Sequence, residues 1–251
     1  ARVSAKISVG MRLDEIMIAN TPASFEPALD YVVTKMPRFP FDKFSSANNK
    51  LSTQMKATGE VMSVGRTIEE SLLKAARSLE IGVNHLYMKK FEAFSDDEML
   101  SYIKDGTDDR IYAIAELLRR KTDIGMICNA TKIDMLFLEK IKNIVKTENK
   151  LKEHIGDTDT LYAAKKLGFS DEFIGKLWGM TGEEIYKIRE KRGMFPVYKM
   201  IDTCASEFES YIPYFYSTYE DENESVVSDK KKIIVLGSGP IRIGQGVEFD
   251  Y

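Results

Sequence analysis

Residues 231–251 read KKIIVLGSGPIRIGQGVEFDY, a short apolar run followed by a glycine-rich turn. Ile233 to Leu236 have the length and the β-branched character of a buried strand. Gly237 and Gly239 allow the tight turn that such a strand makes before a helix. Nucleotide-binding α/β domains begin in this way. Because the helix and the second strand that would bury Ile233 to Leu236 do not follow, we expect this chain to be a piece of a longer protein.

Two nucleotide-binding motifs can be tested on this turn. The dinucleotide fingerprint requires a third glycine at the position that Arg242 occupies. The phosphate-binding loop requires a lysine after Gly244, where the sequence has Gln245. Both interpretations are therefore disfavoured. Two readings stay open: a turn in which Arg242 approaches a phosphate or carboxylate, and glycines that only reverse the chain.

Composition excludes several classes of function. The chain has 251 residues, 43% of them hydrophobic, and its formal net charge of -3 does not favour nucleic acid or an anionic membrane. There is no apolar run of membrane-spanning length and no signal-peptide core at Ala1. Cys128 and Cys204 are too few for a disulfide framework, and His85 and His154 are isolated, which predicts no metal site. We expect a cytoplasmic protein without a membrane segment.

The first part of the chain mixes strand and helix patterns. Val3 to Ile18 roughly follows one face of a helix, although Gly10 weakens its centre. Tyr31 to Val33 predicts a short strand that ends at Lys35 to Arg38, and Gln54 to Arg66 predicts a strand with a bend.

Glu60 is the candidate functional residue of this region. It stands in an apolar run beside Val61 and Met62, where a buried carboxylate is costly unless it is paired, hydrated or protonated. The alternative, given equal weight, is that Glu60 forms a salt bridge with Arg66 or Lys56 at the surface.

From Thr67 onwards the pattern is helical. Thr67 with Glu70, and Ser95 with Glu98, are capping boxes in front of apolar runs. Further helices are predicted at 111–118, 123–130, 134–145 and 161–167. The middle of the chain is therefore expected to be a compact helical domain.

Residues 170–193 have helix-turn-helix proportions, which makes a DNA-binding module the main alternative function. The second helix carries basic residues at Lys187, Arg189, Lys191 and Arg192. It also carries Glu183, Glu184 and Glu190, and the chain has no basic surplus, which argues against nucleic-acid binding. The aromatic-rich stretch 197–219 is more typical of packing between domains than of a base-stacking site, and 221–232 is expected to be a linker.

Four long motifs, in order, resemble the large subunit of glutamine-hydrolysing carbamoyl phosphate synthase. They are TPASFEPALDYVVTKMPRFPFDKF (21–44), STQMKATGEVMSVGRTIEESLLKA (52–75), FPVYKMIDTCASEFESYIPYFYSTYEDE (195–222) and KKIIVLGSGPIRIGQGVEFDY (231–251). The resemblance extends over essentially the whole chain and is weakest over 82–160. Relatives usually have a few more residues between Ile18 and Thr21, so either this loop is short or residues are missing from it.

The resemblance implies a mainly α fold. Residues 1–78 would end the first, carboxyphosphate-forming ATP-grasp half, and 79–222 would form an all-helical oligomerization domain. Residues 223–251 would be a linker and the first strand of the α/β domain that opens the second, carbamoyl phosphate half.

The resemblance also implies a function. The full-length enzyme would be an ATP-dependent ligase that makes carbamoyl phosphate from bicarbonate, glutamine-derived ammonia and two ATP, for arginine and pyrimidine synthesis. ATP and Mg or Mn would bind outside this chain, so the piece itself is expected to hold no cofactor, metal or catalytic residue. A small glutaminase subunit and further copies of the same chain would be partners. Family residues of the carbamate passage correspond to Glu60, Arg242 and Gly246.

Overall fold

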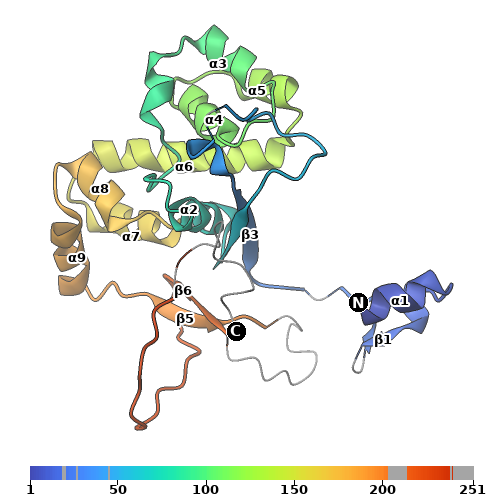
Figure 1. The fold of residues 1–251 in the computed structure, drawn as a ribbon. Coiled ribbons are helices and arrows are strands. Elements are labelled where there is room, and N and C mark those ends of the chain that lie inside the picture. The colour runs from blue at the N-terminus through green and yellow to red at the C-terminus, as the bar shows by residue number, and fades with distance from the viewer. Residues whose placement is uncertain (19–20, 27, 45, 203–213, 238, 240–251) are drawn as a thin grey trace.

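Figure 1 shows a computed structural model of the chain, which describes residues 1–18, 21–26, 28–44, 46–202, 214–237 and 239. The fold is mainly α. Helices α2 to α9 form one body, which packs on the small sheet of β3 and β4, and the sheet of β5 and β6 lies beyond it.

The N-terminal segment is not the single helix that the apolar positions of 3–18 predict. Helix α1 covers only Arg2–Ser8, because Gly10 takes the left-handed conformation (φ +93°) that ends a helix. A 3-10 turn at Leu13–Glu15 follows, and β1 (Met17–Ile18) then pairs with β2 (Thr21–Pro22). In Figure 1 this segment lies to one side of the rest of the chain. The expected loop difference falls on residues 19 and 20, which lie outside the described residues.

The two predicted strands form an antiparallel pair. Strand β3 (Val32–Arg38) pairs with β4 (Gly59–Gly65), and Thr34 lies opposite Ser63. Exposure alternates along β3, as expected for a sheet that is covered on one face only. The loop between the strands contains a 3-10 turn at Pro40–Asp42.

Helix α2 (Ile68–Ser78) belongs to two layers at once. Leu73 and Ala76 pack in the core of the helical body, whereas Ala75 packs with Val61 and Leu79 against the hairpin. The helix begins at Thr67, as predicted, because the Thr67 hydroxyl accepts a hydrogen bond from the Glu70 amide at 3.1 Å.

The helical body confirms the predicted helices. A 3-10 turn at Lys89–Ala93 leads into α3 (Asp96–Tyr102), α4 (Arg110–Arg119), α5 (Ile124–Thr131), α6 (Met135–Glu153), α7 (Thr158–Lys166), α8 (Asp171–Trp178) and α9 (Gly182–Lys191). Both Ser95 and Thr181 head complete capping boxes. The long helix α6 runs beneath α3, α4 and α5 in Figure 1, with α2 and α7 below it, and continues well past its predicted end.

Residues after Pro196, which were expected within the helical domain, form strands instead. Strand β5 (Val197–Met200) pairs antiparallel with β6 (Phe215–Thr218). Tyr216 packs against Val64 and against Tyr31, with ring centroids 6.1 Å apart, so the expected aromatic packing is confirmed at this residue.

The strand expected at Ile233 to Leu236 does not form here. These four side chains are each more than four-fifths exposed, and no described strand pairs with this segment. An apolar run has no reason to adopt strand geometry without a partner for its backbone groups.

We predict that the helical core depends on Leu138 in α6. Leu138 is fully buried, and Leu138→Ala should lower the free energy of unfolding by about 2 to 5 kcal/mol, because it leaves a cavity. Lys146→Ala is the control, since Lys146 lies in the same helix but is exposed. Urea unfolding should show the control within about 0.5 kcal/mol of the wild type. Equal losses in the two variants would contradict the packing described here.

Candidate functional site

Glu60 lies on the outer face of the hairpin, opposite Pro37 in β3. Its side chain is 47% exposed, and its Oε2 atom is 2.9 Å from Lys35 Nζ. The expectation of a buried carboxylate is therefore wrong, because strand alternation turns Glu60 away from α2 while Val61 faces it. The alternative of a surface salt bridge is correct in kind, but its partner is Lys35.

The residues first considered as partners of Glu60 are engaged elsewhere. Arg66 donates from Nε to Glu220 at 2.8 Å and pairs with Asp30. The Lys56 ammonium donates to two backbone carbonyls of the loop that precedes β4.

Arg242 and Gly246 lie outside the described residues, as does Cys204. The structure therefore does not test whether they meet Glu60. Within the described part of the chain, no group of three His, Cys, Asp or Glu side chains could hold a metal ion. None of the helices in that part has the length and apolar character needed to cross a membrane.

The surface around Glu60 is partly apolar. Val33, on the same face of the hairpin, is 47% exposed, and Met62, which lies opposite Lys35, is 68% exposed. Exposed apolar side chains beside a charged pair are typical of a surface that contacts another polypeptide or lines a passage. We refer to Val33, Lys35, Glu60 and Met62 as the Glu60 face.

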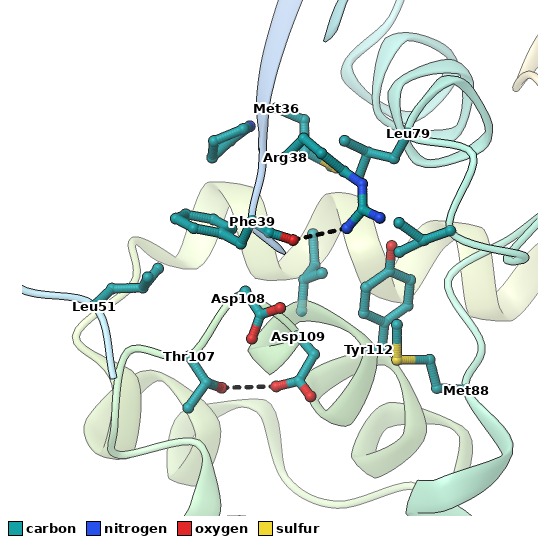
Figure 2. A pocket seen from close by; sticks show the side chains of 13 residues that line it. Met36, Arg38, Phe39, Leu51, Leu79, Met88, Thr107, Asp108, Asp109 and Tyr112 are labelled. Carbon is teal, nitrogen blue, oxygen red and sulfur yellow. Dashed lines mark hydrogen bonds between the residues drawn. The ribbon is translucent and has the colours of Figure 1, made fainter. Parts of the chain in front are cut away.

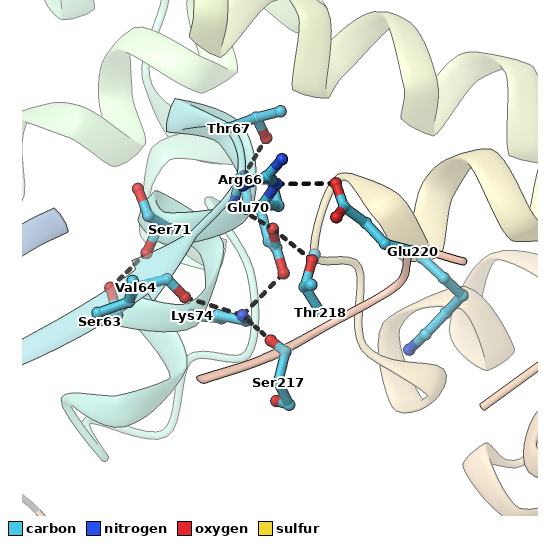
Figure 3. A network of polar contacts seen from close by, with 12 residues as sticks. Ser63, Val64, Arg66, Thr67, Glu70, Ser71, Lys74, Ser217, Thr218 and Glu220 are labelled. Atoms are coloured by element: carbon cyan, nitrogen blue, oxygen red, sulfur yellow. Dashed lines mark hydrogen bonds and ion pairs between the residues drawn. The ribbon is translucent and has the colours of Figure 1, made fainter. Parts of the chain in front are cut away.

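A second polar group, missed from the sequence, centres on the buried carboxylate of Glu70 (Figure 3). Its Oε2 atom accepts from the Arg66 amide at 2.7 Å and from the Thr218 hydroxyl at 3.1 Å. Its Oε1 atom is 2.7 Å from Lys74 Nζ. Glu70 therefore links α2, the end of β4 and strand β6, instead of closing the predicted capping box on Thr67.

Lys74 extends the same network. Its ammonium donates to the Val64 carbonyl at 2.9 Å and to the carbonyl of Ser217. Burial lowers the pKa of Lys74, and the hydrogen bond and charge of Glu70 oppose that shift. Nothing in the sequence marks Lys74 as a buried network residue, because the partner strand β6 lies more than 140 residues away.

The basic residues of the proposed helix-turn-helix are partly internal. Arg189 is only 6% exposed and pairs with Asp171 of α8, which also pairs with Lys165 at 2.8 Å. Burial lowers the pKa of Lys165 to about 8, against the opposing effect of Asp171. On α9, Lys187 pairs with Glu183 at 2.7 Å. These contacts make α8 and α9 a packing unit and remove Arg189 from any surface that could bind DNA.

A third buried group joins His85 to α4 and α6. The carboxylate of Glu148 lies 2.8 Å from His85 Nε2 and accepts two hydrogen bonds from Arg119, each also 2.8 Å long. Burial raises the pKa of Glu148, but the bonds from Arg119 and His85 outweigh it and lower that pKa to about 2. Burial lowers the pKa of His85. The neutral imidazole therefore donates from Nε2 to Glu148.

We predict that Glu148 makes stability depend on pH. Its pKa lies below the ordinary value of 4.5, so its contribution is present above pH 4.5 and is lost as the pH falls towards 2. That contribution amounts to about 3 kcal/mol. At pH 7, Glu148→Gln should cost about 3 kcal/mol, because it removes both short bonds of the buried Arg119 and leaves only its longer contact with Glu116 at 3.4 Å. The difference in the free energy of unfolding between Glu148→Gln and the wild type should become smaller as the pH falls below 4.5.

Urea unfolding at a series of pH values measures this effect. Glu139→Gln is the control, since Glu139 lies on the same helix in an exposed pair with Lys142 and should have little effect. A gap for Glu148→Gln that stayed constant down to pH 3 would contradict the assignment.

Two family models match the chain. Residues 60–193 match the model described as carbamoyl-phosphate synthetase large chain, oligomerisation domain. Residues 229–251 match the carbamoyl phosphate synthase preATP-grasp domain. The first match covers more than half of the chain and includes α2 to α9, with the helical body and its buried ion pairs. The chain therefore belongs to the carbamoyl-phosphate synthetase large-chain family.

Proposed function

We propose that this chain acts within a full-length large subunit that makes carbamoyl phosphate from bicarbonate, glutamine-derived ammonia and two ATP. The observation that carries the proposal is the order of the two matches, an oligomerisation domain followed by the start of a preATP-grasp domain. The product would serve arginine and pyrimidine synthesis in the cytoplasm. A small glutaminase subunit would supply the ammonia.

We propose that ATP and Mg or Mn bind to parts of the full-length subunit outside this chain. From the family resemblance we propose that the nucleotide and metal ligands lie in those other parts, and that this chain is inactive alone.

The Glu60 face is the part of the chain that we propose borders the carbamate passage. A passage for a polar, anionic intermediate requires hydrated polar groups along its wall. The exposed pair of Glu60 and Lys35 offers both signs of charge, with Met62 beside it. Arg242 and Gly246 are proposed as further wall residues from the family resemblance.

Self-association is the second proposed role, through the helical body. Four apolar side chains are between 40% and 55% exposed on α5 and on the first turn of α6, two helices that contact each other: Met126, Met135, Leu136 and Phe137. Exposed apolar residues gathered on neighbouring elements are typical of protein interfaces. Since the matching family model describes an oligomerisation domain, we propose that a second copy of the chain binds this surface.

The assembly role predicts a change in size. Leu136→Asp in the full-length subunit should shift sedimentation velocity towards a smaller species, because a charge at a buried apolar contact is costly. Ile155→Asp is the control, since Ile155 is 60% exposed on the turn after α6. Unchanged sedimentation of Leu136→Asp would remove this surface from the proposal.

The passage role predicts uncoupling. Glu60→Ala in the full-length subunit should lower carbamoyl phosphate synthesis far more than bicarbonate-dependent ATP hydrolysis or ATP formation from carbamoyl phosphate, since each partial reaction needs one site only. Glu139→Ala is the matched control, because Glu139 also forms an exposed ion pair but lies on α6, outside the Glu60 face. Equal losses of all three activities in a folded Glu60→Ala protein, or the same pattern in Glu139→Ala, would contradict the passage role of Glu60. Gly246→Leu should uncouple similarly, provided that the variant folds.

A further inference from the structure

A pocket of about 170 Å³ lies where the hairpin meets the helical body (Figure 2). Its walls come from the end of β3, from the residues after α2, and from the loop and first turns of α4. The four residues of the Glu60 face do not line the pocket, although Pro37, which lies opposite Glu60 in the hairpin, does. The pocket and the proposed passage therefore have different walls, which adjoin at Pro37.

Most of the wall is apolar. Its apolar side chains are Met36, Pro37, Phe39, Leu51, Leu79, Ile81, Met88 and Ile111. The volume corresponds to five or six water molecules at about 30 Å³ each. A ligand with about seven non-hydrogen atoms and an apolar middle would suit this space.

Tyr112 supplies an unsatisfied hydrogen-bonding group in the pocket. The residue is only 2% exposed, and its hydroxyl forms no hydrogen bond with any described residue. Burial raises the pKa of Tyr112 to about 12, so the hydroxyl keeps its proton at neutral pH. A buried hydroxyl without a partner is costly, and a ligand acceptor would remove that cost.

Asp108 supplies a carboxylate on the same pocket wall. The neighbouring Asp109 is fully occupied, since it accepts from Lys90, Tyr102 and Thr107. No described side chain donates a hydrogen bond to Asp108 or forms an ion pair with it. Although Asp108 is exposed to solvent on one side, partial burial and the charge of Asp109 raise its pKa. A cationic ligand group would offset both effects.

The two polar groups lie at different ends of the space. Figure 2 shows the Tyr112 hydroxyl on the side of Arg38, and the Asp108 carboxyl nearer to Phe39 and Thr107. Arg38 donates from Nη1 to the Phe39 carbonyl at 2.7 Å. Its positive charge acts on Asp108 as well, as does that of Lys90, but the carboxylate at the Asp108 end attracts a ligand cation.

The loop between the strands holds the pocket wall in place. The Leu51 amide donates to the Gly106 carbonyl at 2.6 Å, and Lys50 Nζ lies 2.6 Å from Asp105. These bonds fix Leu51 against the loop that carries Thr107 and Asp108.

We propose that this pocket binds a short aliphatic primary amine that carries an oxygen acceptor at its far end. The ammonium contacts Asp108, the alkyl chain packs against Met36, Leu79 and Met88, and the oxygen accepts a hydrogen bond from the Tyr112 hydroxyl. No covalent step is involved. The site binds a ligand class that the synthesis reaction does not require.

Calorimetric titration of the full chain with three probes tests this proposal. The probes are 5-amino-1-pentanol, which has both polar ends, n-pentylamine, which lacks the oxygen, and 1-pentanol, which lacks the nitrogen. The amino alcohol should bind about fivefold more tightly than the amine, which is the effect of one neutral hydrogen bond. It should bind about tenfold or more tightly than the alcohol, because the ammonium forms a charge-assisted bond.

Variants assign each preference to its residue. Tyr112→Phe removes only the unsatisfied hydroxyl, so it should fold normally and abolish the preference for the amino alcohol over the amine. Asp108→Asn should abolish the preference for the amino alcohol over the alcohol. Tyr186→Phe, at an exposed position on α9, is the control and should change neither. Absence of saturable millimolar binding, or equal affinities for the three probes, would overturn the proposal and leave water as the partner of Tyr112.

Discussion

The buried carboxylate of Glu70 is the interaction on which the arrangement of the chain depends. One side chain receives hydrogen bonds from the Arg66 amide and the Thr218 hydroxyl and pairs with Lys74. It therefore fixes the end of β4, helix α2 and strand β6 against one another. Such a charge is costly to bury and becomes tolerable only when all three partners are in place.

Two glycines make room for this carboxylate. A Cβ atom at Gly65 would come within 2.9 Å of Glu70 Oε2, and one at Gly168 would come within 2.9 Å of the Glu70 Cα atom. Gly168 also has a φ of +85°, which other residues rarely adopt. The loop between α7 and α8 can therefore approach α2 closely, and Arg77 donates to the Gly168 carbonyl at 2.6 Å. The helical body is anchored on the same helix as the sheet.

Local signals predicted most of the helices, because caps and apolar periodicity act within a few residues. Thr67 and Ser95 each begin a helix as predicted. The features that the sequence did not predict depend on contacts between residues far apart in the chain. The Glu70 carboxylate accepts from Thr218, which lies 148 residues away, instead of from the Thr67 amide of the predicted capping box. The sequence left a buried and a surface position of Glu60 open, because an apolar run does not reveal which face of a hairpin a helix covers.

Candidate-site residues were the least predictable from sequence. Tyr112 reads as an ordinary apolar position of α4, and Asp108 as a residue before a helix cap. Their common pocket exists only because the end of β3 and the loop at Leu51 lie against them. A single sequence does not show that these distant residues lie together. Glu60, in contrast, was recognisable from its place in an apolar run and from the family motif that contains it.

Helix α2 has a consequence for how genes of this family can be divided. Leu73 and Ala76 belong to the helical core, while Ala75 and Leu79 belong to the hairpin. A split or fusion point after residue 78 would separate α2 from the helical core in which Leu73 and Ala76 pack. Each product would then expose apolar surface that the other should cover. Recombination that preserves folding should therefore keep 59–79 together with the helices that follow. The natural modular unit includes the strand that carries Glu60.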